Sequence, residues 1–162
     1  MTGAKVYVSI AQQRLEYHHE GVTRRYSVST ALKGPGERKG SFQTPRGRHV
    51  IRAKIGAGCP LAAVFVGRRP TGEIYTPELG RQAPQRDWIL SRILWLSGRE
   101  SGRNRGGEVD TLRRFIYIHG SPDEDEFGAP NSHGCIRMRN ADVIELFDLV
   151  DVGDSVVISE HE

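Results

Sequence analysis

The chain has 162 residues, of which 37% are hydrophobic and 27% are charged, and its formal net charge is +3 at pH 7. Its length suits one folded domain with its own core, and its composition is typical of a globular protein rather than a disordered tail. No run approaches the ~18 apolar residues of a transmembrane helix, and the scattered arginines lack the interleaved aromatic residues of a nucleic-acid interface. We therefore expect a single domain over residues 1–162, with no nucleic-acid partner and no stable membrane association.

Residues 1–13 run directly into a polar-interrupted strand and lack the basic region, apolar core and cleavage site of a signal peptide. If residue 1 is the natural start, we expect a cytoplasmic protein, whereas a trimmed N-terminus would leave a periplasmic location open. The two cysteines, Cys59 and Cys135, are expected to be free thiols, because a chain of this size needs no disulfide.

Short alternating segments, separated by glycine, proline or charged turns, dominate the first half of the chain and are typical of β-strands. The expected strands lie at residues 5–10, 14–18, 23–30, 47–55, 62–66 and 88–96. The segment between the last two is rich in proline and glycine and is interpreted as a connection. Residues 97–107 are not expected to form regular structure, and they either frame a site or form a solvated connection.

A further strand is expected at residues 115–119, and because alternate residues share a face, Tyr117 and His119 should point together toward the core or a cleft. A helix is expected to begin at Asn140, which is an acceptable N-cap. Its apolar face carries Val143, Leu146, Phe147 and Val150. With a last strand at 155–158, the pattern predicts a mostly β fold, read as a sandwich with one short helix after the cysteine turn.

A thiol follows a glycine turn, with two imidazoles within local reach. The residues are Ile116-Tyr117-Ile118-His119-Gly120 and Asn131-Ser132-His133-Gly134-Cys135-Ile136-Arg137. A thiol is a poor nucleophile near neutral pH, so it needs a histidine to remove its proton, and backbone amides at the turn can stabilise the oxyanion. The pattern indicates a cysteine acyltransferase with Cys135 as nucleophile. The amides of Cys135 and of Gly134 or His133 are the expected oxyanion donors.

The motif resembles that of the L,D-transpeptidases with the YkuD catalytic domain, whose signature is His-Gly followed by Ser/Thr-His-Gly-Cys. In this chain the signature reads His119-Gly120 and Ser132-His133-Gly134-Cys135, with His119 and Cys135 16 positions apart. Residues 6–10, 26–30 and 44–47 also resemble that family's opening strands and its Thr-Pro-x-Gly loop. The resemblance covers nearly the whole chain and implies a YkuD-type β-sandwich.

The resemblance also implies residue roles. His119 is the expected base, oriented by the backbone carbonyl of Gly120, because a base must be held in one tautomer. His133 is the competing base, and otherwise shapes the pocket. Arg137 either pairs with a substrate carboxylate through two parallel hydrogen bonds or clamps its own loop. Ser132, Gly134 and Tyr117 complete the expected substrate-binding set.

An acidic block lies between base and nucleophile, at Asp123-Glu124-Asp125-Glu126. Such blocks are usually solvated surface. The alternative hypothesis is that this block receives the free amine of diaminopimelate in the substrate.

The resembled family acts on the tetrapeptide stem of peptidoglycan, so Cys135 is expected to displace the terminal D-alanine and form a thioester. We expect an L,D-carboxypeptidase that acts on muropeptides in recycling, with crosslinking or D-amino-acid exchange as the alternative, and acylation of Cys135 by carbapenems. No cofactor or metal is expected. Two other classes stay open: a catalytically silent peptidoglycan-binding module, and a zinc site made by His119, His133 and Cys135, which lacks an apparent fourth ligand.

Overall fold

The computed structural model describes residues 3–161 and consists mainly of β-strands. The strands are β1 (Lys5–Ser9), β2 (Arg14–His19), β3 (Val22–Ser29), β4 (Gly47–Ile55), β5 (Ala63–Val66), β6 (Arg69–Ile74), β7 (Ile89–Gly98), β8 (Tyr117–Ser121), β9 (Ile136–Arg139) and β10 (Ser155–Ser159). The helices are α1 (Pro77–Gln82), the 3₁₀ turn η1 (Gly107–Val109) and α2 (Asn140–Leu149). The mostly β class and the helix after the cysteine turn are confirmed.

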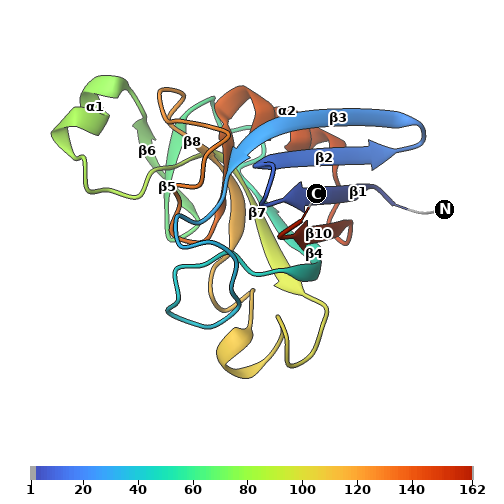
Figure 1. Ribbon diagram of the computed structural model, residues 1–162. Coiled ribbons are helices and arrows are strands. Elements are labelled where there is room, and N and C mark those ends of the chain that lie inside the picture. Colours follow the sequence, from blue (N-terminus) through green and yellow to red (C-terminus); the bar gives the residue numbers. More distant parts are fainter. Residues whose placement is uncertain (1–2, 162) are drawn as a thin grey trace.

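One sheet contains all these strands, in the order β4-β10-β1-β2-β3-β9-β8-β7-β5-β6. Because β4 also pairs with β7, the strands from β4 round to β7 close into a ring, and the β5–β6 hairpin is attached outside it. Figure 1 shows the β2–β3 hairpin and the β5, β6 and α1 segment on opposite sides of the molecule. Most neighbouring strands are antiparallel. The parallel pairs are β1 with β10 and β8 with β9, and the cysteine turn directly precedes β9.

The main core fills the ring and is built from alternate residues of its strands. Its fully buried members include Val6, Leu15, Val28, Ile51, Leu96, Ile118, Ile136, Met138 and Ile158. Helix α2 adds Val143, Leu146 and Phe147 to this core, so the apolar face expected from the sequence is confirmed. Each such side chain contributes about 1.5–3 kcal/mol on burial. A rigid ring therefore supports the parallel strands β8 and β9.

Two expectations about local structure are wrong. The proline- and glycine-rich segment between residues 67 and 87, which was expected only as a connection, contains β6 and α1. Strand β6 is largely exposed, so it lacks the alternation by which strands are found, while α1 begins after Thr76, whose side chain accepts the Leu79 N–H. Asn140 is also not the N-cap of α2: that position is Arg139, and Asn140 is the first helical residue. No helix within residues 3–161 has the length and apolar character needed to cross a membrane.

Candidate active site

The turn before β9 holds Cys135 through two hydroxyl groups. Gly134 has φ 133°, a conformation that favours glycine. Its N–H donates to Ser132 Oγ at 3.2 Å, and that hydroxyl donates to the Cys135 carbonyl at 2.6 Å. From the loop before β4, the buried Thr44 Oγ1 donates to the Gly134 carbonyl at 2.9 Å. The Gly134 amide is thus already used, which leaves the N–H groups of Cys135 and His133 as candidate oxyanion donors.

The thiol of Cys135 lies against the start of β8, because β8 and β9 pair in parallel. Its Sγ accepts the Tyr117 N–H at 3.3 Å and donates to the Phe115 carbonyl at 3.4 Å. Burial raises the pKa of the thiol to about 12, and the nearby carboxylate of Asp87 acts in the same direction. The thiol is therefore protonated near neutral pH, so it needs a base at the moment of attack.

His119 is fully enclosed at the middle of β8. Its Nδ1–H donates to the Gly120 carbonyl at 2.7 Å, and because a carbonyl can only accept, the proton of a neutral ring must lie on Nδ1. The Nε2 lone pair is then the one that can take a proton. Burial lowers the pKa of His119, against the opposing effect of Asp87, so the resting ring is neutral. The contact with Gly120 is the one that the family resemblance implies.

Gly120 is a glycine because its surroundings leave no room for a side chain. A Cβ there would overlap the Leu90 carbonyl oxygen and lie 2.7 Å from Asn140 Oδ1. Asn140 itself is buried, with its Nδ2 donating to the Ser121 carbonyl at 3.1 Å and its Oδ1 accepting from Ser91 Oγ at 2.5 Å. The amide of Asn140 therefore ties helix α2 to β7 and to the end of β8, where the carbonyl that orients His119 lies.

One pocket of about 330 Å³ joins the thiol and the imidazole. Six residues of the expected site line it: Cys135, His119, Tyr117, Ser132, His133 and Arg137. Gly120 and Gly134 support it from behind, through the hydrogen bonds described above. The charged residues in the lining are Arg68, Asp87, Arg114 and Arg137. Three guanidinium groups against one carboxylate make the pocket suitable for an anionic ligand.

The two histidines in the pocket differ in their environment. His133 is exposed, and its ring contacts the edge of Phe42 with the centroids 6.2 Å apart. His119 is enclosed and has its tautomer set by a backbone carbonyl. The geometry favours His119 as base. Within residues 3–161 no three His, Cys, Asp or Glu side chains are grouped as metal ligands, and both cysteines are free thiols.

Three charged residues of the pocket were not predicted from the sequence as site residues: Arg68, Asp87 and Arg114. Arg68, on the β5–β6 turn, lies with its guanidinium carbon 4.8 Å from the Trp95 ring centroid and donates to the Tyr117 hydroxyl at 3.1 Å. Arg114 donates to the carbonyls of Gly36 and Gln43 and so ties the loop before β4 to the pocket. The arginines resemble scattered surface charges in the sequence, and Asp87 is an isolated acid. No local pattern marks any of the three.

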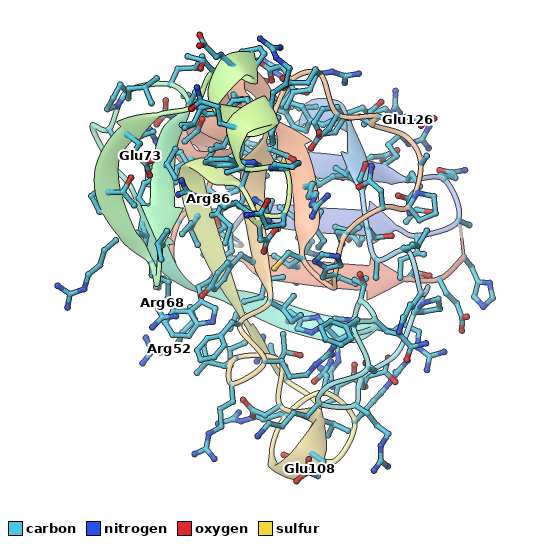
Figure 2. The ribbon with its side chains drawn as sticks, turned by 90° about the vertical axis from the view of Figure 1, so that its left-hand side faces the viewer. Arg52, Arg68, Glu73, Arg86, Glu108 and Glu126 are labelled. Carbon is cyan, nitrogen blue, oxygen red and sulfur yellow. The ribbon has the colours of Figure 1, made fainter. Side chains whose placement is uncertain are left out.

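The acidic block lies away from the pocket, since none of its four residues lines it. Three of its carboxylates accept hydrogen bonds from other parts of the chain: Asp123 from Asn140, Glu124 from Tyr75 and Asp125 from Ser121. The Asp123 carboxylate also lies beside the N-terminus of α2, where a negative charge is favourable. Figure 2 shows Glu126 on the outer part of this loop, far from Arg68. These contacts give the loop a structural role, and the hypothesis that it receives an amine gains no support.

Comparison with known proteins relates this arrangement to one family. A model of the L,D-transpeptidase catalytic domain, YkuD, matches residues 3–158. The chain is 43% identical over 47 residues to the Bacillus subtilis protein YqjB, which is assigned to the L,D-transpeptidases, with 29% of this chain and 27% of YqjB aligned. A second Bacillus subtilis protein with the same assignment, YkuD, is 39% identical over 62 residues, which are 35% of this chain and 38% of that protein.

Among solved structures, the chain is similar to L,D-transpeptidase 3 from Mycobacterium tuberculosis, which was crystallised with a faropenem-derived adduct. The TM-score is 0.60 at 17% identity, and the match covers 98% of this chain and 60% of the mycobacterial one. At that identity the likeness is one of fold. The chain spans less than two thirds of each of these proteins.

Proposed function

Since the chain belongs to the YkuD family of L,D-transpeptidase catalytic domains, we propose that it is a cysteine acyltransferase that acts on the tetrapeptide stem of peptidoglycan. One observation carries the proposal. The Nδ1–H of His119 is held by the Gly120 carbonyl at 2.7 Å, and the same ring lines the pocket that contains the Cys135 thiol. This pair supplies a nucleophile and a base of defined tautomer.

In the first half-reaction, His119 Nε2 takes the proton of Cys135 as Sγ attacks the carbonyl carbon of the third stem residue. The backbone N–H groups at the turn stabilise the oxyanion. The bond from that carbon to the D-alanine nitrogen then breaks, and the leaving amine takes the proton back from His119. The products are free D-alanine and a thioester on Cys135. A neutral thiol and a neutral imidazole at rest suit this sequence, because proton transfer accompanies attack.

In the second half-reaction an acceptor attacks the thioester. Water, deprotonated by His119, releases a tripeptide with a new carboxylate and restores the thiol. An amine of a second stem would give a crosslink instead, and a free D-amino acid would give exchange. We favour hydrolysis, because water is the smallest of these acceptors and needs only about 30 Å³ beside the thioester.

The charge of the pocket suits the proposed donor. The stem ends in a carboxylate, and Arg68 and Arg114 both contribute guanidinium groups to the lining. Both have protein partners that fix their orientation: Arg68 lies beside Trp95, and Arg114 bonds backbone carbonyls. Guanidinium groups held in this way lose little conformational entropy when they bind a carboxylate.

Mass spectrometry of a disaccharide tetrapeptide incubated with the purified protein tests the proposal. We expect tripeptide and free D-alanine from the wild type, none from Cys135→Ala, and unchanged yield from Cys59→Ala, which removes the other free thiol. Addition of a D-amino acid separates the alternatives, since dimers or exchanged termini would identify a transpeptidase. A wild type that forms none of these products would contradict the proposed function.

A second test uses a β-lactam in place of the stem. Attack of Cys135 on the lactam carbonyl breaks the ring C–N bond and leaves the opened inhibitor attached as a thioester. A faropenem-derived adduct is described for L,D-transpeptidase 3 from Mycobacterium tuberculosis. We expect carbapenems and faropenem to add once to the wild type and to Cys59→Ala in intact-mass spectra. An adduct that persists in Cys135→Ala would contradict the assignment of the nucleophile.

A further inference from the structure

Asp87 is the one carboxylate that lines the pocket within the described residues, and it lies opposite Arg137. The two side chains form an ion pair with a single Nη2–Oδ1 contact of 3.4 Å, which is long for such a bond. The Asp87 side chain is 53% exposed and that of Arg137 is 16% exposed. A long, one-contact pair of this kind contributes little to stability. Its groups are available to a ligand with the complementary charges.

The position of Asp87 is fixed by the residues on either side of it. Arg86 bonds Glu73 of β6 through both terminal nitrogens, at 3.1 and 3.0 Å, and its guanidinium carbon lies 4.2 Å from the centroid of the Trp88 ring. Trp88 in turn is buried. Figure 2 shows Arg86 and Glu73 on this side of the molecule, which also carries Arg68. The backbone at Asp87 is therefore anchored on both sides before a ligand binds, which favours selective recognition.

Arg137 is held in a similar way on the other side. It lies on β9 directly opposite His119 of β8 in the pairing register, and its Nη1 is 3.4 Å from both the backbone and side-chain oxygens of Asn131. Its remaining donors can form the paired hydrogen bonds that a carboxylate accepts. The two charges thus flank the imidazole, where the end of a substrate residue would lie during attack on Cys135.

We propose that Asp87 and Arg137 form a subsite for a zwitterionic amino-acid end, in which one carbon carries a free ammonium and a free carboxylate. The inference rests on the proposed function and specifies the substrate. The ammonium pairs with Asp87 and the carboxylate with Arg137, so the ligand replaces the weak contact between them. Two groups have this chemistry: the side-chain end of a diaminopimelate residue in the donor stem, and a free D-amino acid.

Steady-state kinetics with matched tetrapeptides test the subsite. The four tetrapeptides differ only in the third residue. It is meso-diaminopimelate, meso-diaminopimelate with the side-chain carboxylate amidated, meso-diaminopimelate with the side-chain amine acetylated, or lysine. For the diaminopimelate stem, we expect Asp87→Asn and Arg137→Gln each to raise KM by roughly three- to tenfold. Asp87→Asn should leave KM for the N-acetylated stem unchanged, and Arg137→Gln should leave KM for the lysine and amide stems unchanged. Glu124→Gln, in the acidic block outside the pocket, is the control and should change none of these values.

The second arm measures exchange with D-methionine at saturating donor. If the variants raise KM for D-methionine but keep the wild-type preference among the four tetrapeptides, the subsite binds the free D-amino acid, and the proposal stands. If both variants change all substrates equally in both arms, the subsite is overturned. A general loss of kcat would not mimic the expected pattern, which is a change in preference between stems.

Failure of the proposed function has a separate signature. If the wild type turns over no tetrapeptide, that function is wrong, and calorimetric titration of Cys135→Ala with free meso-diaminopimelate then decides the subsite. Binding that weakens in the Asp87→Asn background supports it. Equal binding in both backgrounds, or no binding at all, overturns it.

Discussion

Replacing Asn140 by alanine tests whether one buried amide holds the site together. The side chain is 2% exposed, and its loss leaves the Ser121 carbonyl and the Ser91 hydroxyl without the partners described above. Each buried polar group left unpaired costs about 1–3 kcal/mol, so we expect Asn140→Ala to lower the free energy of unfolding by about 2–4 kcal/mol. For a chain of this length that corresponds to a fall in Tm of about 5–15 °C.

The matched control is Asp148→Ala, an exposed position on the same helix, where we expect a change within about 0.5 kcal/mol. Thermal and urea unfolding monitored by circular dichroism measure both variants, and the rate of thioester formation with faropenem measures the effect on the site. That rate should fall in Asn140→Ala, because the Ser121 carbonyl, next to the Gly120 carbonyl that orients His119, loses its hydrogen bond from the amide. If Asn140→Ala and Asp148→Ala unfold alike, the reasoning is refuted.

Asn140→Asp separates the hydrogen bonds from side-chain volume. At pH 7 its carboxylate would face the Ser121 carbonyl and Asp123, both of which now accept from the amide. We expect it to be less stable than Asn140→Ala at pH 7, because repulsion is added to the lost donors. Acidification to pH 5 should reduce the difference in the free energy of unfolding between this variant and the wild type, since a protonated carboxyl can donate again. A loss of stability that is independent of pH would contradict the assignment of the loss to charge repulsion.

Three further outcomes are expected. Gly120→Ala should lower stability by about 1–3 kcal/mol in urea unfolding, because its Cβ overlaps the Leu90 carbonyl; full stability would contradict that overlap. Burial holds the pKa of His49 at about 4, below its value of 6.5 in the unfolded chain. The stability present above pH 6.5 should therefore fall toward pH 4, by at most about 3 kcal/mol, and His49→Asn should show a flatter pH profile. Alkylation of Cys135, followed by peptide mass mapping, should keep accelerating from pH 7 to 9, because its pKa is about 12; a plateau below pH 8 would indicate a thiolate.

The sequence predicted the parts of the fold that depend on local pattern. Alternation located the ring strands, and the spacing of Val143, Leu146 and Phe147 located α2. It failed at β6, because an exposed strand has no alternation to detect. It also misplaced Asn140 as a cap, because capping is the common local role of asparagine, while its actual partners, Ser91 and Ser121, are distant in sequence.

The site shows the same division. Cys135, His119 and the Gly120 carbonyl lie close in sequence and belong to a motif, so their proximity could be predicted. Asp87 and Arg68 come from the segment between β5 and β7, and only the pairing of that segment with the ring brings them to the pocket. Such contacts depend on topology, which local pattern does not encode.

The β5–β6 hairpin is joined to the ring through only two paired positions, Val64 with Leu90 and Phe65 with Ile89. Ring closure by β4 and β7 does not involve the hairpin. Strand β5 still packs at the site, because Ala63 and Phe65 share a buried cluster with Tyr117, against which Cys135 lies, so the part that can vary begins after β5. The hairpin turn carries Arg68, and the segment that follows leads to Asp87. Exchange of residues 67–87 can therefore change what enters this pocket, while the residues that pack around the thiol and the imidazole stay the same.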